Sequence, residues 1–121
     1  MAAQVARTAC ERAGYSVEVA HSLGDGIGLL STFLYDCILL DLTLPDVQDN
    51  GITAITELAK VTHLPIVVMT ANKDESLIDE CLNAGAQDYL IKTNGPDLLR
   101  IARAINNVVI RSRSWARLRP A

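Results

Sequence analysis

Cys37-Ile38-Leu39-Leu40-Asp41 is a short apolar run that closes on a carboxylate, and the loop signal Leu44-Pro45 follows soon after it. A strand of this composition is typical of a parallel sheet that is covered on both faces, so Asp41 is predicted to stand at the carboxyl end of a buried strand. In open α/β sheets, ligands bind at those carboxyl ends. A lone acid in such a place indicates either a nucleophile or a metal ligand.

Helical and strand patterns alternate on both sides of this run. Ser22 and Asp25 resemble a capping box, and they precede an apolar stripe over Leu23–Leu34 that predicts a helix. Gly14 and Gly85 stand where helix C-caps are expected. The order α-β-α-β-α-β-α-β-α predicts an α/β fold, a doubly wound parallel sheet with helices on both faces. The expected strands are Tyr15–Ala20, Cys37–Asp41, Ile66–Thr70 and Asp88–Ile91.

The composition is that of one globular domain. The chain has 121 residues, half of them apolar, and no apolar stretch approaches the length that spans a bilayer. Met1–Arg12 has the pattern of an amphipathic helix rather than of a signal peptide, so a cytoplasmic location without membrane contact is expected. Cys10, Cys37 and Cys81 lack the paired spacing of a zinc or redox site and are interpreted as small core residues.

Basic charge gathers at the end of the chain, where four arginines follow residue 110 and no acid follows Asp97. Without these four, seven basic residues face fourteen acidic ones, which leaves the body near −7. Acidic bodies do not usually bind nucleic acid, so the domain itself is not expected to do so. We therefore predict one domain over residues 1–110, and residues 111–121 are interpreted as a basic helix end or linker. The four are Arg111, Arg113, Arg117 and Arg119.

Three strands in succession end in side chains with functional groups: Asp41, Thr70 and Lys92. Consecutive parallel strands usually lie side by side, so the carboxylate, hydroxyl and ammonium are expected at one edge of the sheet. This set suits phosphoryl transfer to a carboxylate, because an Asp can attack phosphorus while positioned donors stabilise the oxygens. A Mg²⁺ ion normally neutralises the remaining charge.

Three segments, in this order and spacing, carry a resemblance to the receiver domain of two-component response regulators, over about residues 2–110. The resemblance implies a flavodoxin-like fold and phosphorylation of Asp41 by a histidine kinase or phosphotransfer protein. It also implies Thr70 as the switch hydroxyl and Lys92 as the phosphoryl-binding lysine. The segments are Tyr35-Asp36-Cys37-Ile38-Leu39-Leu40-Asp41-Leu42-Thr43-Leu44-Pro45, Leu64-Pro65-Ile66-Val67-Val68-Met69-Thr70-Ala71 and Ala84-Gly85-Ala86-Gln87-Asp88-Tyr89-Leu90-Ile91-Lys92.

The same resemblance implies roles for three further residues. Tyr89 matches the aromatic rotamer switch of the family. Thr43 matches the residue whose backbone carbonyl binds Mg²⁺ beside the carboxylate of Asp41. Thr43 and Asn72 also occupy the variable positions that tune loss of the phosphoryl group.

The chain departs from the receiver pattern at three places. It starts where the helix after the first central strand begins, so that strand and the two adjacent acids that end it are absent. The loop that contains Asp46–Asn50 is two residues longer than usual, and Thr93 stands where many receivers have proline. Without the acidic pair, Mg²⁺ binding is expected to be weak or absent. Either the start of the chain has been clipped, or this is a degenerate receiver that works by contacts alone.

Two functions from different classes therefore remain open. The first is a phosphoacceptor receiver, a signalling domain rather than an enzyme, which passes a kinase's state to an output domain beyond residue 121. The second is a non-phosphorylated receiver shape that serves dimerisation or partner docking. A small hydrolase that uses Asp41 as nucleophile is disfavoured, because no second acid or base stands at a strand end.

Overall fold

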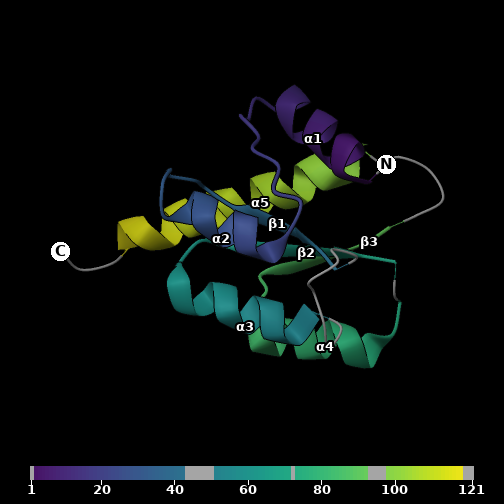
Figure 1. The fold of residues 1–121 in the computed structure, drawn as a ribbon. Coiled ribbons are helices and arrows are strands. Elements are labelled where there is room, and N and C mark those ends of the chain that lie inside the picture. Colours follow the sequence, from purple (N-terminus) through teal and green to yellow (C-terminus); the bar gives the residue numbers. More distant parts are fainter. Residues whose placement is uncertain (1, 43–50, 72, 93–97, 119–121) are drawn as a thin grey trace.

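The computed structural model describes residues 2–42, 51–71, 73–92 and 98–118, and these form one parallel sheet between two layers of helices (Figure 1). The described sheet has three strands in the order β1-β2-β3, so β2 is central. The predicted α/β class, with helices on both faces of a parallel sheet, is confirmed. The elements are α1 Ala2–Arg12, α2 Leu23–Leu30, β1 Ile38–Asp41, α3 Ile52–Val61, β2 Ile66–Thr70, α4 Glu75–Ala84, β3 Asp88–Ile91 and α5 Leu98–Leu118.

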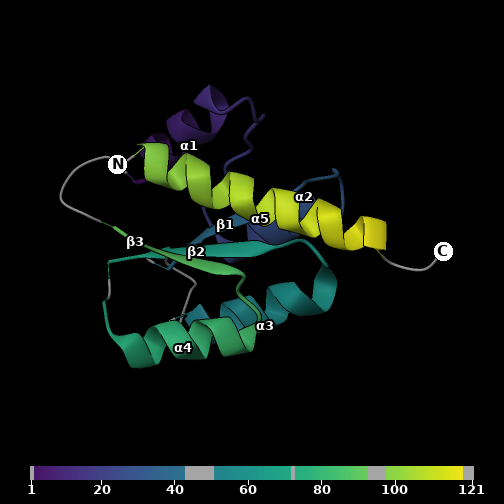
Figure 2. The ribbon, with the colours of Figure 1, turned by 180° about the vertical axis from the view of Figure 1, so that it is seen from behind.

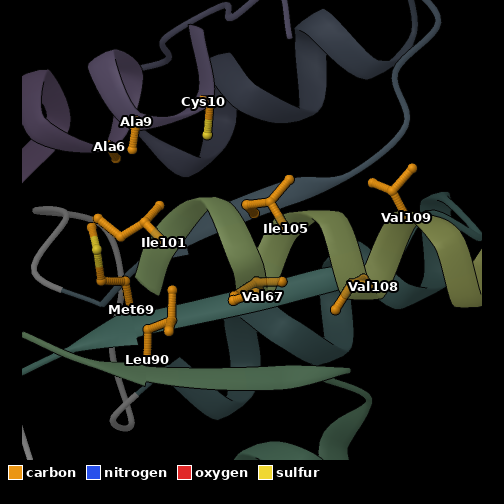
Figure 3. Close-up of a cluster of buried hydrophobic side chains, with 11 residues drawn as sticks. Ala6, Ala9, Cys10, Val67, Met69, Leu90, Ile101, Ile105, Val108 and Val109 are labelled. Atoms are coloured by element: carbon orange, nitrogen blue, oxygen red, sulfur yellow. The ribbon is translucent and has the colours of Figure 1, made fainter. Parts of the chain in front are cut away.

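Each face of the sheet carries its own apolar core. Helices α1 and α5 cover one face, and α3 and α4 cover the other, as the two opposite views show (Figures 1 and 2). The first core joins α1 and α5 to alternate residues of β2, among them Val67 and Met69 (Figure 3). The second core takes the intervening β2 residues, Ile66 and Val68, together with α3 and α4. All five residues of β2 are buried, because both faces and both edges of this strand are covered.

Local signals in the sequence set the ends of the helices. The Ser22 side chain accepts a hydrogen bond of 3.1 Å from the Asp25 backbone N–H, so the predicted cap of α2 forms. Gly14 and Gly85 take φ values of +96° and +127° just after α1 and α4, in a region that side chains with a Cβ rarely adopt. Asp74 caps α4 by accepting a bond of 2.9 Å from Ser76 N–H.

The prediction of a strand at Tyr15–Ala20 was wrong. This stretch has no assigned strand, and no described strand lies between it and β1. A strand exists only as part of a ladder, and an alternating pattern cannot supply the missing neighbour. The stretch is anchored instead at its start, where the Tyr15 hydroxyl donates a bond of 2.6 Å to Asn106 Oδ1 on α5.

Two predictions about burial also need correction. Strand β1 was expected to be buried on both faces, but only Leu40 is buried and its other residues are half-buried. The reason is that β1 has a strand neighbour on one side only within the described residues. Leu34, which was assigned to the stripe of the second helix, lies past the end of α2 and is fully exposed.

The three cysteines have free thiols. Cys10 and Cys81 are buried in the two cores, and Cys37 is half-buried beside the first core, as small apolar residues would be. Among the described residues, no helix combines the length and apolar character that a membrane crossing requires.

Candidate functional site

The carboxylate of Asp41 and the ammonium of Lys92 meet at the carboxyl edge of the sheet. Lys92 Nζ donates a hydrogen bond of 2.8 Å to Asp41 Oδ1. The Asp41 side chain is 22% exposed and the Lys92 side chain 20%. Solvent therefore reaches the pair but screens it less than it would screen a pair on the surface. The edge of the sheet therefore holds an oxygen nucleophile and a cation within direct contact.

Main-chain bonds beyond the strand ends hold this pair in place. Leu42 N donates to Met69 O at 3.1 Å, and Lys92 N donates to Thr70 O at 2.7 Å. Each bond carries the ladder one residue past the last residue of β1 or β3. The backbone on both sides of the Asp41–Lys92 pair is thereby tied to the central strand.

Thr70 and Tyr89 form a second unit next to the pair. Thr70 is the last residue of β2 and is buried, whereas Tyr89 on β3 is half-buried. Burial raises the pKa of the Tyr89 phenol, nearby Cys81 and Asp74 raise it further, and a hydrogen bond with the Thr70 side chain opposes this shift. The Tyr89 hydroxyl is therefore protonated at neutral pH and is linked to the hydroxyl at the strand end.

The structure thus brings together four residues that the sequence singled out: Asp41, Thr70, Tyr89 and Lys92. Thr43 and Asn72, the other two site residues expected from the resemblance, lie outside the described residues. The same holds for the long loop at residues 46–50. The proximity of Asp41 and Lys92 is an observation, whereas the roles of all six residues remain predictions.

A family comparison decides the identity of this arrangement. The family model for the response regulator receiver domain matches residues 1–104, which is most of the chain. The chain belongs to the response regulator receiver family. The receiver domains among solved structures share its fold: a two-component response regulator from Clostridium difficile superposes with a TM-score of 0.77 at 32% identity, covering 91% of this chain and 87% of that one. A CheY-like receiver from Methanospirillum hungatei, at 22% identity and a TM-score of 0.79, supports the fold alone.

Relatives by sequence are regulators that are much longer than this receiver. The alginate biosynthesis transcriptional regulatory protein AlgB of Pseudomonas putida is 34% identical over 99 residues, which is 81% of this chain and 22% of the relative. The KDP operon transcriptional regulatory protein KdpE of Escherichia coli is 40% identical over 89 residues, which is 74% of this chain and 39% of the relative. The receiver therefore spans between about a fifth and two fifths of these relatives.

Receiver domains generally bind Mg²⁺ at the phosphorylation site. The side chains near Asp41 show whether this receiver has the ligands that the ion needs. The described residues contain no group of three or more His, Cys, Asp or Glu side chains that could hold a metal. The carboxylate of Asp41 stands at the sheet edge, and Lys92 already binds it. Mg²⁺ prefers oxygen ligands and usually takes one or two carboxylates together with phosphate oxygens. The described side chains therefore do not form a metal site on their own.

The structure also shows a polar group that sequence reasoning missed. The hydroxyl of Tyr35 is buried, and it has no hydrogen-bond partner among the described residues. Tyr35 entered the sequence interpretation only as part of a matching segment. No pattern in the sequence signals its isolation, because that depends on which segments pack around it.

Proposed function

We propose that this receiver accepts a phosphoryl group on Asp41 from the phosphohistidine of a histidine kinase or phosphotransfer protein. The observation that carries the proposal is the 2.8 Å contact between Lys92 Nζ and Asp41 Oδ1 at the carboxyl edge of the sheet. An Asp41 oxygen would attack phosphorus, and the bond from phosphorus to the donor imidazole would break as the new P–O bond forms. The imidazole leaves with the electron pair of that bond and takes up a proton.

Lys92 has a separate part in this step. It now neutralises the carboxylate, and the carboxylate loses its full charge when it becomes an acyl phosphate. The ammonium would then pair with an oxygen of the phosphoryl group, where negative charge develops during transfer. A cation already at this position stabilises the transferred group without a large rearrangement.

Thr70 and Tyr89 are proposed to convert this chemistry into a change of surface. The Thr70 hydroxyl now bonds Tyr89, and a phosphoryl oxygen would compete for it. Tyr89, released from this bond, would favour a more buried rotamer and thereby alter the surface near Lys73–Leu82 and α5. The change is a shift of population, so the phosphoryl contacts must favour one conformer over the other.

The whole protein is proposed to regulate transcription through an output domain, because AlgB and KdpE are named as transcriptional regulatory proteins. The acidic body argues against direct nucleic-acid contact by the receiver itself. A homodimer, a cytoplasmic location and tuning by Thr43 and Asn72 stay predictions. So does the division of the chain at residue 110, which falls within α5.

A second candidate function is a receiver that is not phosphorylated and acts as a dimerisation or docking module. The observation that favours it is the donor set, since the described residues supply no cluster of acids for the metal that phosphoryl transfer normally uses. The two functions predict different outcomes with a small phosphodonor.

Incubation of the folded chain with acetyl phosphate, over a series of Mg²⁺ concentrations, tests the proposal by intact mass. We expect a gain of one phosphoryl group that is lost in Asp41→Asn and kept in Asp79→Asn, because Asp79 is exposed on α4 away from the sheet edge. Lys92→Met is expected to slow the gain roughly a hundredfold, as removal of one charge-stabilising donor does. Thr70→Ala is expected to gain the phosphoryl group as the parent chain does. Its NMR resonances around α4 should not shift on modification, whereas those of the parent chain should.

Absence of any mass gain in protein that is folded by circular dichroism, at every Mg²⁺ concentration, would overturn the phosphoacceptor proposal. The interaction module would then be the better account. A gain that persists in Asp41→Asn would place the acceptor elsewhere.

A further inference from the structure

Gly51 and Leu42 meet beside the carboxyl edge of the sheet. Gly51 is the N-cap of α3, and it is buried at φ +88°. Leu42 directly follows Asp41, the last residue of β1. A Cβ built on Gly51 would overlap Leu42 Cδ2 and would lie 3.1 Å from both Cγ and Cδ1 of the same side chain. The side chain of Leu42 therefore occupies the space that any other residue at position 51 would need.

This contact sets Gly51 apart from the other described glycines with positive φ. A Cβ on Gly14, at φ +96°, would meet nothing within 4 Å, and a Cβ on Gly85 would lie 3.6 Å from that of Ala59. At those two positions the backbone conformation alone favours glycine. At Gly51 a close side-chain contact is added to the same backbone preference, so an experiment can separate the two effects.

Leu42 is held from two sides and has little freedom to make way. Its backbone N–H donates to Met69 O at 3.1 Å, which ties it to β2. Its side chain packs against the core formed with α3 and α4. Rotation about its Cβ–Cγ bond would move the two methyl carbons but not Cγ, and rotation about Cα–Cβ would disturb that close-packed core. A side chain at position 51 is therefore expected to displace Leu42.

A displacement of Leu42 would reach the carboxylate of Asp41, because the two residues share a peptide unit. Asp41 Oδ1 accepts a hydrogen bond of 2.8 Å from Lys92 Nζ, so its position is closely defined. Misplacement of a reacting group by about 1 Å can slow a reaction roughly a hundredfold, because the geometry of attack is lost. The packing of Leu42 thus bears on the chemistry proposed for Asp41.

We propose that Gly51 is a positioning residue for phosphoryl transfer to Asp41. Because Gly51 has no side chain, Leu42 can pack against the start of α3 and keep the end of β1, and with it the carboxylate, in contact with Lys92. Gly51 itself would touch neither the phosphoryl group nor its donor. This role rests on the proposed phosphoacceptor function of Asp41, and it adds a residue that sets the rate of that reaction.

Two matched glycine substitutions separate the contact from the backbone strain. Gly51→Ala is expected to slow the gain of mass from acetyl phosphate at least roughly tenfold per folded molecule, because Asp41 is displaced. Gly14→Ala imposes a similar strain with nothing nearby, so its rate should stay within about twofold of that of the parent chain. Circular dichroism gives the folded fraction of each variant.

Removal of the Leu42 side chain should rescue the substitution. Leu42→Ala deletes Cγ, Cδ1 and Cδ2, the three atoms that a Cβ on Gly51 would meet. In a double-mutant cycle, Gly51→Ala should therefore slow the reaction at most about twofold in the Leu42→Ala background, against roughly tenfold in the parent chain. A general loss of folding would not be repaired by a second destabilising substitution.

Amide hydrogen exchange gives a readout that does not require phosphorylation. The Leu42 amide, which donates to Met69 O, should exchange at least roughly tenfold faster in Gly51→Ala than in Gly14→Ala. The Lys92 amide, which donates to Thr70 O, should change less and serves as the internal control.

A parent chain that gains no phosphoryl group would overturn the function proposed for Asp41, and exchange at Leu42 would then decide by itself whether Gly51 positions the end of β1. Equal rates of phosphorylation in the parent and Gly51→Ala would show that Gly51 does not position Asp41. Equal slowing by Gly51→Ala and Gly14→Ala, or no rescue by Leu42→Ala, would also overturn the proposed role. So would exchange at Leu42 that is equal in the two glycine variants.

Discussion

Asp41 illustrates how one contact serves both the fold and the proposed chemistry. A carboxylate that is 22% exposed at the end of a strand loses much of its hydration, and the ammonium of Lys92 at 2.8 Å compensates for that loss. The same ammonium is what a phosphoryl group on Asp41 would require. Because the backbone of Lys92 is bonded to Thr70 O at the end of β2, the cation is positioned before any phosphodonor arrives.

At the same scale, the thiol of Cys37 is predicted to be almost inert. Burial raises its pKa from the ordinary 9.0 to about 12, with Cys10 and Asp36 adding to the shift and a hydrogen bond with the Ile38 backbone opposing it. The thiolate is the reactive form, so at pH 8 alkylation by iodoacetamide should be roughly a thousandfold slower than for a free cysteine. Peptide-resolved mass spectrometry of the alkylated chain measures this rate.

The matched control is the same reaction in urea, where Cys37 should recover the rate of an ordinary cysteine. The shift also has a consequence for stability. Since the folded pKa is the higher one, the contribution of the protonated thiol is fully present below about pH 9 and is lost as pH rises toward about 12. Rapid alkylation of the native thiol at pH 8 would contradict the prediction.

At the scale of elements, glycines have two opposite roles in this fold. Gly85 ends α4 at φ +127°, where a Cβ is strained whatever space surrounds it. Gly28 lies inside α2 at an ordinary φ, and a Cβ there would meet nothing within 4 Å. The first glycine is required by its backbone conformation, whereas the second only weakens its helix.

Gly28→Ala is therefore predicted to stabilise the chain by about 0.5–1 kcal/mol, the helix-propensity difference between the two residues. Gly85→Ala is predicted to destabilise it by about 1–2 kcal/mol, because alanine must adopt a left-handed φ. Urea unfolding of both variants beside the parent chain gives the two free energies. The interpretation would be wrong if both substitutions changed stability in the same direction.

At the scale of the whole molecule, stability concentrates on β2. This strand contributes to both apolar cores and pairs with strands on both sides, so it can open only when the sheet itself opens. The stretch at residues 16–20 has no assigned strand, so no strand ladder protects its amides. The two segments differ in how much structure must be lost before their amides meet water.

Hydrogen exchange should reveal this contrast directly. Amides of Val67–Met69 are predicted to exchange only through global unfolding, whereas those of Ser16–Ala20 should exchange through local opening that costs little free energy. NMR-detected exchange on the uniformly labelled chain compares the two segments in a single sample. Protection at Ser16–Ala20 equal to that of β2 would show that the stretch is part of the cooperative core.

By itself the sequence determined most of the local structure and the composition of the site. The periodicity of apolar residues identified β1, β2 and β3, and Ser22 and Gly85 marked helix ends because their effects act within a few residues. Strand-end positions also placed Asp41, Thr70 and Lys92 at one edge, since consecutive strands of such a sheet lie side by side.

Only the tertiary structure decided what happens at the open side of β1. An alternating pattern at Tyr15–Ala20 predicted a strand, yet a strand needs a ladder partner and none of the described residues supplies one. The same absence leaves β1 half-buried and the Tyr35 hydroxyl without a partner there. Ladder pairing and hydrogen-bond satisfaction depend on residues far apart in the chain, so local patterns do not report them.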